Sequence, residues 1–128
     1  MSYKYYQPNK KDLKDDYGDC VIRSITKALN KEWLDVYDEL IPYGRELQCM
    51  PNNKPAYEAY LKSKGYEWQG LKVEKGKKRP TPKTFSKTHN KGIYILRLSH
   101  HLVTLVDGNY YDTWDSGDGC IYGYWKIS

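Results

Sequence analysis

The chain has 128 residues, of which 39% are hydrophobic and 15% aromatic, and its formal net charge is +5. A chain of this length can form one domain whose hydrophobic core is stable without disulfides or a bound metal. We therefore predict a single domain over residues 1–128. No run of residues approaches the length of a membrane span, and no apolar signal segment opens the sequence. We therefore expect a cytoplasmic protein with no membrane partner.

The three cysteines, Cys20, Cys49 and Cys120, show no paired spacing. An odd number of cysteines without a C-x-x-C pair argues against a disulfide scaffold. No close group of cysteine and histidine indicates a zinc site. We expect free thiols in a reducing compartment, with no bound metal and no cofactor.

The first 17 residues show no periodicity, and we predict an extended or irregular arm. Gly18 and Asp19 then supply a flexible joint and an N-cap. The apolar spacing that follows predicts a helix over about 19–30, with Cys20 in its first turn. The N–H groups and the dipole at a helix start favour an anion, so this position can convert a thiol into a nucleophilic thiolate.

Two further helices are predicted from the same kind of spacing. One runs over about 31–40 and ends at Pro42 and Gly44, and the other runs over about 54–64. Residues 44–53 between them are expected to form a loop.

The second half of the chain changes to strand-like patterns. Thr81 and Pro82 predict the N-cap and first position of a short helix that ends near His89. Alternation is weak over 66–73, and further strands are predicted over 93–98, 101–106, 110–114 and 120–127. Because helices precede strands in the chain, we predict an α+β fold in which the N-terminal helices pack on a C-terminal, mostly antiparallel sheet.

Much of the positive charge lies between Lys72 and Lys91, where eight basic residues accompany one acidic residue, Glu74. This stretch is either a solvated basic loop or a surface for an anionic partner such as nucleic acid. It lacks the regularity of a nucleic-acid-binding motif.

A base and an orienting group for Cys20 follow later in the chain. His101 begins a predicted strand, and Asp112 lies in the next strand after a tight turn. A two-residue turn puts His101 and Asp112 on one face, whereas Asp115 joins that face only if the loop gains a residue. Histidine can accept the thiol proton, and a carboxylate can hold the imidazole in the useful tautomer. We predict a triad of Cys20, His101 and Asp112, although each residue alone also fits a purely structural role.

A resemblance to the papain-like cysteine peptidases is carried by three segments: Gly18-Asp19-Cys20-Val21-Ile22-Arg23-Ser24-Ile25, His101-Leu102-Val103-Thr104-Leu105-Val106 and Asp112-Thr113-Trp114. These segments most resemble those of small bacterial and phage members of the family, including the double-glycine leader peptidases. The resemblance implies a cysteine that heads a helix packed on an antiparallel sheet, and a histidine that heads a strand. It also implies that Trp114 shields the bond between the histidine and its orienting residue.

One position departs from the family pattern. The resemblance implies an oxyanion-hole glutamine six residues before the cysteine, but Lys14 stands there. Gln7 and Asn9 lie farther upstream and are the candidate donors if the arm folds back to the site. Without them, the oxyanion depends on the Cys20 N–H and the helix start.

These observations predict a thiol hydrolase that cleaves a peptide or amide bond in a peptide or protein substrate. Three alternatives stay open. The chain could be a weak or inactive papain-like binding protein, a basic module for an anionic partner, or another thiol fold such as a cell-wall amidase or a transglutaminase-like acyltransferase.

Overall fold

The computed structural model describes residues 2–11 and 18–128. The helices of this part of the chain are α1 (Cys20–Leu29), α2 (Trp33–Leu47), α3 (Lys54–Ser63) and α4 (Pro82–Thr88). Its strands are β1 (Tyr3–Tyr5), β2 (Trp68–Gly70), β3 (Ile93–Leu98), β4 (His101–Val106), β5 (Asn109–Asp112) and β6 (Gly123–Lys126).

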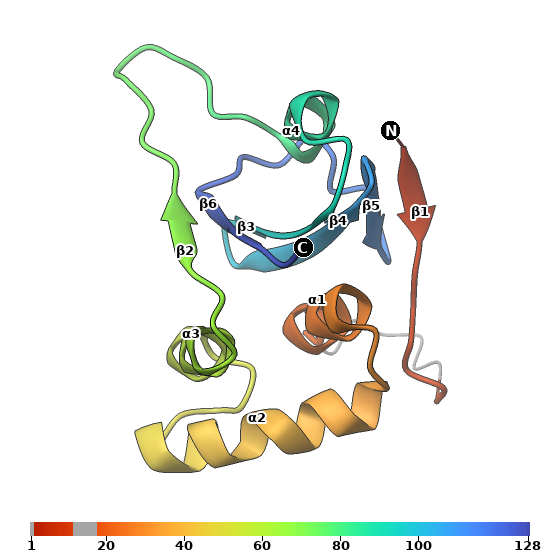
Figure 1. The fold of residues 1–128 in the computed structure, drawn as a ribbon, viewed down its shortest axis with the longest axis vertical. Coiled ribbons are helices and arrows are strands. Elements are labelled where there is room, and N and C mark those ends of the chain that lie inside the picture. The colour runs from red at the N-terminus through yellow and green to blue at the C-terminus, as the bar shows by residue number, and fades with distance from the viewer. Residues whose placement is uncertain (1, 12–17) are drawn as a thin grey trace.

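The described residues form an α+β structure built on one mixed sheet of six strands, in the order β1-β5-β4-β3-β6-β2. Helices α1 and α3 lie under one side of the sheet with α2 beneath them, while α4 covers the other side (Figure 1). Each side has its own apolar cluster, one around Ile25 of α1 and Leu102 of β4, the other around Phe85 of α4 and Leu96 of β3. The predicted α+β class is therefore confirmed.

Helix α1 is central because its apolar residues recur at helical spacing and meet both the sheet and the other helices. Seven of its ten residues are buried, and Ile25 is fully inaccessible to solvent. Burial of one such aliphatic side chain contributes about 1.5–3 kcal/mol. The hydroxyl of Thr104 on β4 also donates to the Ser24 carbonyl at 2.6 Å, which fixes α1 along the sheet.

The β4–β5 hairpin has the predicted two-residue turn. Val106 pairs with Asn109, and the two residues between them, Asp107 and Gly108, have φ values of 47° and 86°. Positive φ at both central positions defines a type I′ turn, whose twist matches that of the flanking strands. The turn therefore fixes the register that carries Asp112 to the end of β5.

The predicted end of the second helix is wrong, because α2 continues through Pro42 and Gly44 to Leu47. A Cβ on the buried Gly44 would lie 2.8 Å from the Cys49 carbonyl oxygen, so the glycine allows the following chain to approach rather than ending the helix. Val36 and Leu40 are fully buried and anchor the helix despite the hydrogen bond that a proline removes.

The N-terminal arm, predicted as extended or irregular, is extended at Tyr3–Tyr5, but these residues form a strand that was not predicted, β1, which pairs in parallel with β5. This pairing makes the sheet mixed. The strand is short, and its residues are exposed or half-buried, so no apolar alternation reveals it in the sequence. Backbone pairing with a strand more than 100 residues away forms it, and the Tyr3 hydroxyl adds a hydrogen bond to the Asp112 carbonyl at 3.2 Å.

The predicted strand over 66–73 is reduced to the three residues of β2, which pairs with β6 at the edge of the sheet. A Cβ on Gly123 of β6 would lie 2.2 Å from the Trp68 ring and 2.7 Å from the Gln69 carbonyl oxygen. The indole of Trp68 therefore lies directly on the β6 backbone, and only glycine permits this approach.

Replacement of Gly123 by alanine is expected to destabilise the protein by about 1–3 kcal/mol, because Trp68 and β2 must move away from β6. Urea unfolding followed by tryptophan fluorescence measures this change. Gly70→Ala on the same rung is the matched control, because the nearest neighbour of its added Cβ is a side-chain atom 3.3 Å away. Equal losses of stability in the two variants would contradict the steric argument.

Candidate active site

Three separate elements place the predicted triad at one end of the sheet. Cys20 is the first residue of α1, His101 is the first residue of β4, and Asp112 is the last residue of β5. Cys20 and His101 line the same pocket, whose volume is about 520 Å³. The pocket opens where the start of α1 meets the turn between β3 and β4.

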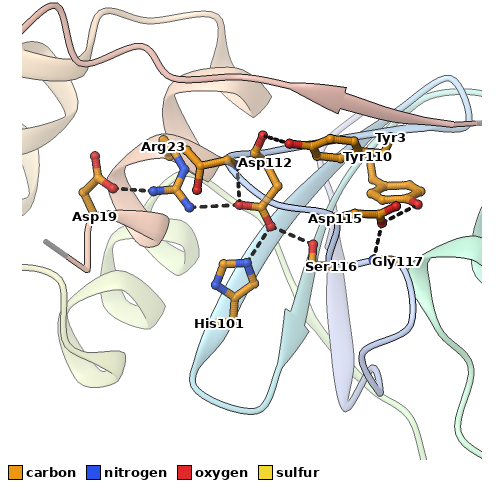
Figure 2. Close-up of polar contacts among 10 residues, drawn as sticks. Tyr3, Asp19, Arg23, His101, Tyr110, Asp112, Asp115, Ser116 and Gly117 are labelled. Carbon is orange, nitrogen blue, oxygen red and sulfur yellow. Dashed lines mark hydrogen bonds and ion pairs between the residues drawn. The ribbon is translucent and has the colours of Figure 1, made fainter. Parts of the chain in front are cut away.

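His101 and Asp112 form a short hydrogen bond, with 2.6 Å between Nε2 and Oδ2 (Figure 2). Since this bond uses Nε2, Nδ1 is the ring nitrogen that can serve Cys20. Burial alone lowers the pKa of His101, but hydrogen bonds to Asp112 and Cys20, together with their negative charges, outweigh burial and raise that pKa to about 9. The imidazole is therefore protonated at neutral pH.

The Asp112 carboxylate is almost inaccessible to solvent, with 1% of its side chain exposed. Besides the bond to His101, it accepts hydrogen bonds from Arg23 Nη2 at 2.9 Å, Ser116 Oγ at 2.6 Å and the Thr113 N–H at 2.8 Å. Burial raises the pKa of this carboxyl, but the hydrogen bonds from His101 and Ser116 outweigh burial and lower it. Asp112 is thus a fixed anion, as the orientation of an imidazolium requires.

Arg23 connects the orienting carboxylate to a second one. Its side chain is 4% exposed, and its guanidinium bridges Asp112 and Asp19 (Figure 2). Asp19 also accepts a hydrogen bond from Trp33 Nε1 at 3.1 Å. The charges therefore alternate in sign from the partly buried Asp19 through the buried Arg23 and Asp112 to the protonated, partly buried His101, which is the arrangement that lets buried ions coexist.

Gly18 and Asp19, the two residues directly before α1, are held in place by side-chain contacts. Asn52 Nδ2 donates to the Gly18 carbonyl at 3.1 Å, and the Asp19 side chain faces Arg23 and Trp33 instead of capping the helix N–H groups. Cys20 consequently stands at a fixed helix start, where the first-turn N–H groups and the dipole favour an anion.

Trp114 lies beside the imidazole, with its ring centroid 5.0 Å from that of His101. Trp114 is about half exposed, so it lies at the surface against one side of the imidazole. This is where the resemblance predicts a shielding residue.

Asp115, the alternative orienting residue, has other partners. One of its oxygens accepts hydrogen bonds from the Tyr110 hydroxyl at 2.8 Å and from the Gly117 N–H at 3.0 Å (Figure 2). The structure therefore brings Asp112, and not Asp115, to His101.

Gln7 and Asn9 are not brought to the pocket. The Gln7 side-chain oxygen accepts a hydrogen bond from the Asn9 N–H at 2.9 Å, and that of Asn9 accepts one from the Lys11 N–H at 3.0 Å. These bonds shape the arm locally, and neither residue belongs to the described lining of the pocket. Lys14 lies outside the described residues.

Sequence reasoning missed Arg23 and Ser116. Arg23 carries a signal, because a cation near the start of a helix is unfavourable to the dipole and so indicates a carboxylate partner. The sequence around Ser116 carries no comparable signal, since its contact with Asp112 depends on the loop after β5.

The basic stretch Lys72–Lys91 lies outside this network. Lys75, Lys77 and Lys78 are exposed, whereas the Arg79 guanidinium is 4.3 Å from the centre of the Tyr122 ring and donates to the Leu71 carbonyl. Lys83 is also exposed, and it forms a surface ion pair with Asp118.

The described part of the chain holds no group of three or more His, Cys, Asp or Glu side chains placed to bind a metal ion. In the same residues, no helix combines the length and the apolar character that crossing a bilayer requires. The three cysteines are free thiols.

Comparison of the chain with protein-family models, with curated proteins and with solved structures gives no match.

Proposed function

We propose that the protein is a papain-like cysteine hydrolase that cleaves a peptide or amide bond with Cys20, His101 and Asp112. The observation that carries the proposal is the buried chain of contacts from Arg23 through Asp112 to His101, which ends at a cysteine on a helix start. A core histidine with only a structural role needs no ionised carboxylate held by three other donors.

The reaction starts from a Cys20 thiolate beside the His101 imidazolium. The sulfur attacks the carbonyl carbon, and the electron pair of the C=O π bond moves to the oxygen. When the C–N bond breaks, Nδ1 of His101 gives its proton to the leaving amine, and a thioester on Cys20 remains. His101 then takes a proton from water, the resulting hydroxide attacks the thioester, and the carboxylic acid product leaves as the thiolate returns.

Asp112 stays ionised through both steps, because its hydrogen bonds hold its pKa low. Among the described residues, the Cys20 N–H and the start of α1 are candidate donors for the developing oxyanion. Loss of one such donor costs about 3 kcal/mol of barrier, so the position of Gln7 and Asn9 away from the pocket predicts a slow enzyme.

Alkylation with iodoacetamide at pH 6 tests the proposal. Cys20 is expected to react at least about tenfold faster than Cys120, although Cys120 is the more exposed thiol. Mass spectrometry of the cysteine peptides gives each rate separately, and His101→Ala is expected to remove the advantage. A Cys20 rate no higher than that of Cys120 would end the proposal.

The placement of Gln7 and Asn9 also favours a second candidate, a binding protein on the same fold. The two functions differ in their dependence on the thiol. If a peptide library is bound equally well by the wild type and by Cys20→Ala, and neither protein turns over a peptide, the binding function is the correct one.

A further inference from the structure

The pocket beside Cys20 has a cationic wall. Two of its lining side chains carry positive charge, Lys54 at the start of α3 and Arg97 on β3, and no acidic residue belongs to its described lining. Since the His101 imidazolium neutralises a thiolate on Cys20, the positive charges of Lys54 and Arg97 are not balanced by a negative charge in the described lining. A pocket with this balance favours an anionic ligand.

Arg97 is held in place by aromatic side chains. Its guanidinium carbon lies 4.4 Å from the centre of the Trp68 ring, and Trp68 packs on Trp125 with 4.7 Å between ring centres. The described carboxylates form no ion pair with Arg97. Stacking occupies the face of the guanidinium plane, and one N–H at its edge is bonded to Tyr57, whereas the remaining N–H groups can bind a carboxylate as a fork.

Tyr57 of α3 links this wall to the reacting sulfur. The ring of Tyr57 packs edge to face on Trp125, 5.9 Å between centres. Burial raises the pKa of Tyr57 to about 12, the Arg97 side chain donates a hydrogen bond to the Tyr57 hydroxyl oxygen, and the charge of Cys20 is near enough to affect that hydroxyl. The Arg97 guanidinium, the Tyr57 hydroxyl and the Cys20 thiol therefore face one space.

Taking the proposed hydrolase function as its basis, we propose that Cys20 acts on acyl substrates that carry a carboxylate beside the scissile bond. Arg97 binds that carboxylate through its N–H edge, the protonated Tyr57 hydroxyl donates beside it, and Lys54 adds a long-range attraction. Arg97 is then a specificity-determining residue, and neutral substrates lack its contribution.

Two alkylating reagents of nearly equal size test this substrate class. Iodoacetate and iodoacetamide transfer similar groups to the same sulfur, but only iodoacetate carries a carboxylate. The ratio of their rates at Cys20 is expected to fall about tenfold in Arg97→Gln and about two- to threefold in Lys54→Gln. Arg97→Lys keeps the charge but loses the fork, and is expected to give an intermediate ratio.

Lys62→Gln is the matched control, because it removes the same charge from an exposed position of α3 outside the pocket. An unchanged ratio in Lys62→Gln with reduced ratios in the Arg97 and Lys54 variants supports the proposal. The exposed Lys54 keeps the test valid if the Arg97 variants fold poorly. Equal ratios in Lys54→Gln, Arg97→Gln and Lys62→Gln would overturn the substrate class while leaving the reactivity of Cys20 intact. If the hydrolase proposal itself is wrong, the outcome is different, because Cys20 then reacts slowly with both iodoacetate and iodoacetamide.

Discussion

Substitution of Asp112 by asparagine is expected to lower the pKa of His101 from about 9 by about one to three units. The variant loses the negative charge and the charged hydrogen-bond acceptor that together outweigh burial. Titration of the histidine ring signals by NMR measures the shift directly. At pH 7 a larger part of the imidazole is then neutral, and a neutral imidazole no longer stabilises a thiolate.

The alkylation of Cys20 by iodoacetamide at pH 6 is therefore expected to slow by about tenfold or more in Asp112→Asn. Asp115→Asn is the matched control, since Asp115 bonds Tyr110 and Gly117 rather than His101. If both variants leave the pKa of His101 near 9, the contact with Asp112 does not determine the protonation of the imidazole.

The same shift has a consequence for stability. In the folded protein the pKa of His101 is raised from about 6.5 to about 9, so its contribution is complete below about pH 6.5 and is lost as the pH rises to about 9. Unfolding experiments across this window are expected to show a smaller loss of stability in Asp112→Asn than in the wild type.

Local sequence patterns predict those parts of the fold that local physics decides. The apolar spacing of α1 is enough to place Cys20 at its start, and the type I′ turn at Asp107 and Gly108 sets the parity that brings His101 and Asp112 to one face. Both features depend on residues a few positions apart. The continuation of α2 through Pro42 does not, because distant packing overrides the helix-breaking tendency of proline.

The parts of the site that the sequence does not predict depend on long-range contacts. Arg23 meets Asp112 across 89 positions of sequence, and β1 pairs with a strand more than 100 residues away. Ser116 lies only four residues from Asp112, but its bond depends on the path of an irregular loop. Residue spacing can therefore predict which candidate triad residues come together, whereas the groups that hold them appear only in the folded chain.

Replacement of Arg23 by methionine is expected to lower the free energy of unfolding by about 3–5 kcal/mol, because it leaves the buried carboxylate of Asp112 and the partly buried one of Asp19 without their shared cation. Chemical denaturation measures this loss. Arg23→Lys keeps the charge but cannot bridge both carboxylates as a planar fork, so an intermediate loss is expected.

A role in positioning Asp112 also predicts a change in pH dependence that simple loss of packing does not produce. Loss of a guanidinium 2.9 Å from the carboxylate is expected to raise the pKa of Asp112, because an opposite charge favours the ionised form. In the wild type, the ionised Asp112 contributes stability above its ordinary pKa of about 3.9, and this contribution is lost on acidification. In Arg23→Met the loss is expected to begin at a higher pH than in the wild type. The double variant Asp19→Asn, Arg23→Met removes one of the unpaired carboxylates and is expected to recover part of the stability, because the two residues are coupled. If Arg23→Met lowers the free energy of unfolding by less than about 1 kcal/mol, and stability depends on acidic pH as in the wild type, the alternating charges do not hold His101 in place.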